Sequence, residues 1–216
     1  IALTQILVHY GFLKALDLPT ALSDLNFFIL SLATLFIAAA GYIINDIQDV
    51  AIDRINKPKK TFIPAPFSQN SAFNYYLVLN ISGVGLGFLL SYRMGFGNFA
   101  TLFILISALL YVYANFLKRV LLLGNLIVSV IVASAIGIVM VFDTIPVLQG
   151  NEQQLVNPLS VLKDYAVFAL MLNFLREIVK DIEDANGDYA AGIQSLPILL
   201  GLERTAKLSA YIAVIY

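Results

Sequence analysis

The chain has 216 residues, of which 60% are hydrophobic and only 12% are charged, and its formal net charge is −1. A soluble globular domain carries about 45–50% apolar and about 25% charged residues, so this composition excludes that class. The absence of cysteine excludes a disulfide framework and a thiolate metal site, and the near-neutral charge gives nucleic acid no electrostatic footprint. The composition therefore predicts an integral membrane protein.

Seven apolar segments follow one another along the chain. A helix that crosses a bilayer needs about 20 mostly apolar residues, and the segments are residues 1–13, 25–44, 70–92, 94–117, 120–142, 158–175 and 205–216. They are too long and too apolar for the strands of a membrane barrel. The sequence therefore predicts an all-α, multi-pass helical bundle, and we expect a single transmembrane domain over residues 1–216 that is clipped at both ends.

Basic residues gather after the second, fourth and sixth segments. Eight of the thirteen lie there: Arg54, Lys57, Lys59, Lys60, Lys118, Arg119, Arg176 and Lys180. The opposite side holds Lys14, Arg93 and Lys163. By the positive-inside rule, the exits of the even-numbered segments are predicted to face the cytoplasm.

Half of the fourteen acidic residues fall in two short windows, residues 45–53 and 181–188. Both windows contain the spacing Asp-x2-Asp-x3-Asp, and each stands at the predicted cytoplasmic exit of an apolar helix. The aspartates are Asp46, Asp49 and Asp53 in the first window and Asp181, Asp184 and Asp188 in the second.

This spacing has a chemical consequence if each helix continues through its window. Positions i, i+3 and i+7 then lie within about 60° of one helix face, and carboxylates so close together favour bound cations. Mg²⁺ takes oxygen ligands and usually shares one or two carboxylates with substrate phosphates. Two such faces predict a cradle for a metal-bridged diphosphate, whose remaining charge nearby basic residues would neutralise: Arg54, Lys57, Lys118, Arg119 and Lys180.

Two other interpretations of the acidic windows exist. The carboxylates could simply solvate the ends of membrane helices, but two windows with the same spacing on the same predicted face favour a site. A membrane carrier also uses ionisable residues and internal repeats, but near the bilayer midplane on broken helices. Here the acids lie at the helix exits.

The two windows and their flanks resemble the signatures of the UbiA superfamily of intramembrane prenyltransferases. The first is Asn45-Asp46-x2-Asp49-x3-Asp53 with Asn56-Lys57-Pro58 after it, and the second runs from Arg176 through Asp188 to Gly192. Leu117-Lys118-Arg119, followed by Gly124-Asn125, matches a third pattern. After Lys57-Pro58 the chain departs from the family's Arg-Pro with Lys59 and Lys60.

The resemblance implies a fold, an activity and a set of site residues. The fold would be a bundle of about nine transmembrane helices around a cavity open to lipid, and the activity would be Mg²⁺-dependent transfer of a prenyl group from an isoprenyl diphosphate. Carried over by position, Asn45, Asp49 and Asp53 would serve one metal site and Asp184 and Asp188 the other, with the four aspartates acting in catalysis. Asp46 and Asp181 are secondary metal candidates, and Lys57, Lys118 and Arg119 would hold the diphosphate.

The acceptor is less constrained than the donor. The second signature is most similar to that of members which alkylate geranylgeranylglyceryl phosphate, a lipid acceptor, and an aromatic acid such as a hydroxybenzoate or naphthoate is the alternative. Tyr42, Tyr111 and Tyr113 are candidates for stabilising the allylic cation by their aromatic faces, or for packing and interfacial anchoring.

Three further features are predicted to be structural. His9, the only histidine, lies away from both windows, which favours a structural or interfacial role. Residues 143–157 are predicted to form an external loop. Gly83, Gly85 and Gly87 are predicted to permit close helix packing.

Overall fold

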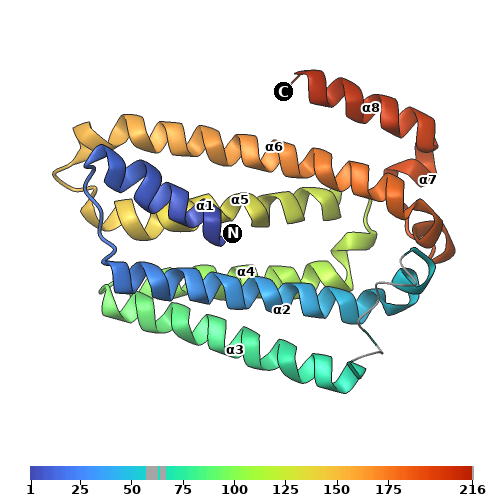
Figure 1. Ribbon diagram of the computed structural model, residues 1–216, viewed down its shortest axis with the longest axis horizontal. Helices are drawn as coiled ribbons and strands as arrows, with labels where there is room; N and C mark the ends of the chain where they lie inside the picture. Colours follow the sequence, from blue (N-terminus) through green and yellow to red (C-terminus); the bar gives the residue numbers. More distant parts are fainter. Residues whose placement is uncertain (57–62, 64–66, 216) are drawn as a thin grey trace.

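The computed structural model describes residues 1–56, 63 and 67–215, which form helices and the connections between them (Figure 1). The α-helices are α1 (Ala2–Ile6), α2 (Asp24–Asn56), α3 (Gln69–Arg93), α4 (Ala100–Asn115), α5 (Leu123–Thr144), α6 (Glu152–Ala190), α7 (Leu196–Leu200) and α8 (Leu202–Ile215). A π-helical stretch, Leu7–Leu13, prolongs α1, and short 3₁₀ turns flank α4 and α5. Five of the helices, α2 to α6, are long and apolar enough to cross a membrane. The predicted all-α membrane bundle is thus confirmed.

The two helices that carry the acidic windows run in the same direction. The C-terminal ends of α2 and α6 lie at one end of the bundle, together with α7 and the connection from α4 to α5 (Figure 1). Helix α2 continues to Asn56 and α6 to Ala190, so both acidic windows are helical throughout. The aspartates of each window therefore share one face of a continuous helix, as their spacing predicts.

Helix α6 stops directly after its acidic window. Gly192 adopts a left-handed backbone with φ of 68°, a conformation that glycine adopts without steric cost. The amide of Ile193 then donates to the carbonyl of Asp188 over 2.9 Å. This turn brings the next residues, up to Ser195, back over the end of α6.

Small residues let α3 pack closely on its neighbours. A Cβ at Gly83 would lie 2.7 Å from Cγ1 of Ile37 in α2, and one at Gly87 would lie 2.3 Å from the ring of Phe103 in α4. In lipid, where apolar side chains gain little by leaving the solvent, such close backbone approach is a main source of helix association. Close packing is confirmed for these two glycines, whereas Gly85 faces open space.

The predicted loop over residues 143–157 is wrong. Helix α6 begins at Glu152, six residues before the expected start at Pro158, and Leu155, its fourth residue, is fully buried. Hydropathy did not indicate a helix here because Glu152, Gln153 and Gln154 are polar. The buried Leu155 nevertheless packs this first turn of α6 against the bundle. Asp143 lies at the end of α5 and is fully buried rather than external.

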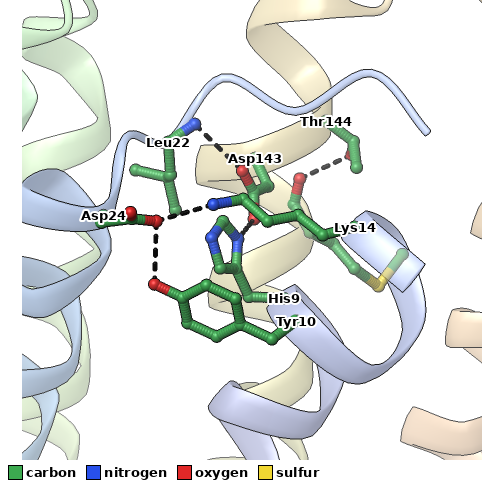
Figure 2. Close-up of polar contacts among 8 residues, drawn as sticks. His9, Tyr10, Lys14, Leu22, Asp24, Asp143 and Thr144 are labelled. Atoms are coloured by element: carbon green, nitrogen blue, oxygen red, sulfur yellow. Dashed lines mark hydrogen bonds and ion pairs between the residues drawn. The ribbon is translucent and has the colours of Figure 1, made fainter. Parts of the chain in front are cut away.

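Asp143 belongs to a polar cluster that fastens the N-terminal helix to the bundle (Figure 2). His9 donates through Nδ1 to Asp143, and the other carboxylate oxygen accepts the amide of Leu22 over 3.0 Å. The His9 ring also stacks on Phe27 of α2, with centroids 4.3 Å apart. One buried carboxylate therefore joins α5 to the N-terminal helix and to the segment before α2, a structural placement of the kind expected for His9.

Candidate active site

A cavity of about 500 Å³ opens among α2, α4, α5 and α6, and its lining changes character along its length. At the end where α2 and α6 finish, polar and charged side chains line it. Further into the bundle, the lining is formed mostly by apolar side chains of α2, α4 and α5, with Thr34 and Ser134 among them. The cavity therefore offers a charged mouth and an apolar interior, which suits an amphiphilic ligand.

All six aspartates of the two windows line the charged mouth, as does Asn45. The sequence repeat thus corresponds to two helix faces that share one cavity. Asp188 is 8% exposed, and Asn45 and the other five aspartates are half-buried.

Asp49 is fixed by contacts from two directions. Asn45, one turn earlier in α2, donates through Nδ2 to Oδ2 of Asp49 over 2.7 Å. Lys118 donates through Nζ to Oδ1 of Asp49 over 2.5 Å, and its side chain is only 8% exposed. Gly124 permits this approach of the α4–α5 connection, since a Cβ there would lie 2.8 Å from the Lys118 Cα.

In the second window, Asp181 has a partner from α5. Asn125 donates through Nδ2 to Oδ2 of Asp181 over 2.8 Å. The amide side chains of Asn45 and Asn125 thus orient one aspartate in each window.

Asn56 joins the two acidic helices directly. Its side-chain amide donates to the carbonyl oxygen of Asp184 over 3.1 Å, and its Oδ1 accepts the amide of Gly187 over 2.9 Å. The fit requires glycine, because a Cβ at Gly187 would lie 2.4 Å from the Asn56 amide nitrogen. The end of α2 is therefore held against the second acidic window by a two-point contact.

The basic candidates are placed unequally. Lys118 and Lys180 line the cavity. Arg54 and Arg119 are exposed and are absent from the described lining of the cavity, and Lys57 falls outside the described residues. A diphosphate in the mouth would thus meet Lys118 and Lys180 directly.

Of the aromatic candidates, Tyr42 and Tyr113 line the cavity and Tyr111 does not. Tyr111 packs on Tyr76, with ring centroids 6.4 Å apart, and borders a separate groove between α3 and α4. Packing, the alternative considered for these tyrosines, is what the structure shows for Tyr111.

Among the polar cavity residues that were not sequence candidates for the site are Asn125, Arg176, Glu177 and Ser195. Arg176 and Glu177 pair with each other over 2.5 Å and stand about one turn before Asp181, so helical periodicity from the second window points to them. Asn125 and Ser195 reach the mouth only through tertiary packing, and the spacing within the windows carries no signal for them.

The donor set suits Mg²⁺. Carboxylate and amide oxygens, the ligands this ion prefers, face the mouth from both α2 and α6. Over residues 1–56, 63 and 67–215, no three acidic or histidine side chains lie close enough to hold an ion by themselves. Because Mg²⁺ keeps one or two carboxylates and completes its coordination with substrate phosphates, this arrangement fits an ion that binds together with a diphosphate.

Fold and cavity together define a helical membrane protein with an acidic, amphiphile-sized site at one end of the bundle. The family model of the UbiA prenyltransferase family matches residues 8–216, and the chain belongs to that family. It is an integral membrane protein.

Relatives of this chain share one name. It is 36% identical over 203 residues to digeranylgeranylglyceryl phosphate synthase of Methanobrevibacter smithii, covering 93% of this chain and 64% of that protein. It is 31% identical over 209 residues to the synthase of the same name from Thermococcus kodakarensis, covering 95% of this chain and 68% of that protein. The chain therefore spans about two thirds of these relatives, and less than that of the first.

A solved structure agrees with the fold. A structure described as giving insights into digeranylgeranylglyceryl phosphate synthase in membranes superposes with a TM-score of 0.64 at 25% identity. The match covers 99% of this chain and 67% of that one. The family that the acidic windows predicted is thus confirmed.

Proposed function

We propose that the protein is a prenyltransferase that joins a geranylgeranyl group to geranylgeranylglyceryl phosphate. The observation that carries this proposal is the single cavity with both acidic windows at its mouth and apolar walls behind them. Such a cavity accommodates an isoprenyl diphosphate, with its charge at the mouth and its tail inside. The relatives named above support the ether-lipid acceptor.

In the reaction proposed here, the C1–O bond of the donor breaks and the diphosphate leaves with the bonding electrons. A new bond forms between C1 and the hydroxyl oxygen of the acceptor, and the hydroxyl proton passes to the released diphosphate. Mg²⁺, when bound at the acidic mouth, would supply stabilisation of the leaving diphosphate. The aspartates of the two windows and Asn45 are the residues that would hold the ion.

The chain's own groups position the reactants and balance their charge. Lys118 and Lys180 place positive charge at the mouth, where the diphosphate oxygens lie and gain charge on departure. Tyr113 lines the cavity beside Asp49 and Asp181, where its ring face would stabilise positive charge at C1 by about 0.5–2 kcal/mol. The apolar walls exclude water from C1, which limits hydrolysis of the donor.

The test is a product assay on the full-length protein in detergent or lipid nanodiscs. Geranylgeranyl diphosphate is offered with geranylgeranylglyceryl phosphate or with 4-hydroxybenzoate, with Mg²⁺ or with EDTA. We expect Mg²⁺-dependent diphosphate release and the digeranylgeranyl ether by mass spectrometry with the lipid acceptor alone. Prenylated hydroxybenzoate would move the protein to the aromatic-acceptor branch, and binding of donor without any diphosphate release would favour a carrier.

A further inference from the structure

The apolar interior of the cavity reaches the buried core of the bundle. Ile106 and Leu110 of α4 and Ile131 and Ala135 of α5 form its walls. Deeper in the bundle, the lining includes Ile37, Phe103 and Ile138. These three are 2%, 0% and 4% exposed and belong at the same time to the buried apolar core. On the α4 and α5 sides, packed core side chains such as Val139 and Phe142 lie beyond this layer. The described lining also includes Thr34, one turn further along α2, and Ile1.

Phe103 is the least movable member of this layer. On one side its ring lies against the backbone of α3 at Gly87, where a Cβ would come within 2.3 Å of its Cδ2 atom. On the other side it packs on Phe142, with ring centroids 5.6 Å apart. A longer ligand cannot displace such a ring without disturbing three helices, since close-packed interiors resist changes of even one methylene.

The distance from the charged mouth to this layer corresponds to a particular chain length. From Asp49 to Ile37 along α2 and from Asn125 to Ile138 along α5, the rise of about 1.5 Å per residue gives about 18 Å and about 20 Å. Four isoprene units contain sixteen main-chain carbons, which extend to about 19 Å at ordinary bond lengths. The distance from the mouth to the Phe103 layer therefore matches a chain of four units.

We propose that Phe103, flanked by Ile37 and Ile138, is the floor that sets the longest prenyl donor this protein accepts. The inference rests on the function proposed above and adds the residue that determines donor specificity. It predicts that removing the ring admits longer donors. An added side chain on the α3 side of the ring, at Gly87, would favour shorter donors.

The experiment places farnesyl, geranylgeranyl and geranylfarnesyl diphosphates in competition for the full-length protein and reads the products by mass spectrometry. We expect the wild type to prefer the C20 donor over the C25 donor by about tenfold or more, because extra methylenes that do not fit a hydrophobic pocket cause discrimination of this size. Phe103→Ala should lower that preference about tenfold or more. Gly87→Ala, whose methyl group pushes the Phe103 ring toward the cavity, should shift the preference to the C15 donor.

Phe99→Ala is the matched control. Phe99 is a buried aromatic residue that packs on the same Phe142 ring, with centroids 5.1 Å apart, but it is absent from the described cavity lining. Its loss should lower stability and leave the order of donor preference unchanged. If Phe103→Ala does not yield folded protein, Phe103→Leu and Ile138→Ala deepen the cavity less and should shift the preference in the same direction.

The outcomes separate this inference from the proposed function. The inference is overturned if the Phe103 and Ile138 variants fold, turn over the C20 donor and keep the C20-to-C25 preference of the wild type. The prenyl tail would then leave the cavity sideways between helices. Absence of Mg²⁺-dependent turnover by the wild type with any donor and acceptor would instead overturn the proposed function. A binding competition among the three diphosphates needs no acceptor. It therefore tests the role of Phe103 in donor length even if the acceptor offered is the wrong one.

Discussion

At the scale of single residues, Lys118 and Asp49 form a close ion pair at the mouth of the cavity. The lysine comes from the α4–α5 connection and is almost fully buried. Its ammonium group can serve an aspartate and a phosphate at once, because it has three donors. We infer that it holds both the first window and the diphosphate.

Replacing this lysine tests that role. Lys118→Ala should raise the KM for the prenyl diphosphate on the order of 10- to 100-fold, the range for residues that support a metal site. Lys118→Arg, which keeps the charge, should recover part of the loss. Lys207→Ala removes a lysine that pairs with Glu203 on exposed α8 and should change neither KM nor kcat. An unchanged KM in Lys118→Ala would contradict the assignment.

A second residue-scale prediction concerns Asp143, which lies about 27 Å along α5 from Asn125 at the mouth. Asp143→Ala leaves His9 and the Leu22 amide without their acceptor, and breaking a buried pair costs about 3–5 kcal/mol. The variant should therefore lose activity faster on heating, while its initial kcat/KM at low temperature stays near wild type. Asp17→Asn, in an exposed turn where asparagine tolerates the left-handed backbone, is the control. Equal inactivation half-lives for the two variants would rule out a stabilising role for the His9–Asp143 pair.

At the scale of elements, the distance between α2 and α6 determines whether the two acidic windows can act on one ligand. The two hydrogen bonds of Asn56 and the missing side chain of Gly187 set this distance. An error of about 1 Å in such positioning can cost about 100-fold in rate. Asn56 is thus a positioning residue for the second window.

Asn56→Ala should lower kcat on the order of 10- to 100-fold and raise the Mg²⁺ concentration needed for half-maximal rate. Asn56→Asp can still accept the Gly187 amide but cannot donate to Asp184, so an intermediate effect is expected. Titration of the rate with Mg²⁺ measures both quantities. A purely structural role would lower the amount of folded protein and leave the Mg²⁺ dependence of the surviving enzyme unchanged.

The elements themselves were largely predictable. The start of α3 was expected near residue 70 and lies at Gln69, and continuation of α2 and α6 through their acidic windows was the premise of the site argument. Hydropathy and helical period carry this information because both are local. The start of α6 was missed because a buried leucine, rather than an apolar run, holds its first turns.

Contacts between distant residues were not predictable from spacing. Asn125 with Asp181, Asn56 with Gly187 and His9 with Asp143 join residues 56, 131 and 134 positions apart. Nothing in the local sequence marks such pairs, since tertiary packing alone brings them together. The two windows were found because their spacing repeats on one helix face, whereas their partners have no period.

At the scale of the whole molecule, the charged end of the bundle is expected to face the cytoplasm. Arg54, Lys118, Arg119, Arg176 and Lys180 lie at that end, and the opposite end holds Lys14, Arg93 and Lys163. Because short loops rich in lysine and arginine stay in the cytoplasm, we propose that the mouth of the cavity opens there.

The absence of cysteine from the chain makes this orientation simple to test. Gln194→Cys marks an exposed position at the mouth, and Gln153→Cys marks an exposed position at the start of α6, at the other end. In intact cells, a membrane-impermeant maleimide should label Gln153→Cys and should reach Gln194→Cys only after permeabilisation. The reverse pattern would place the mouth outside.

The central claim is that two acidic windows, one on α2 and one on α6, act together on a diphosphate. The most direct measurement is Mg²⁺-dependent diphosphate release from geranylgeranyl diphosphate by Asp49→Asn, Asp184→Asn and Asp164→Asn, the last an exposed aspartate near the opposite end of α6. We predict that each of the first two variants loses on the order of 100-fold or more in rate, and that Asp164→Asn matches the wild type. Turnover that survives both window substitutions would contradict the account and leave the two acidic clusters as solvated helix ends.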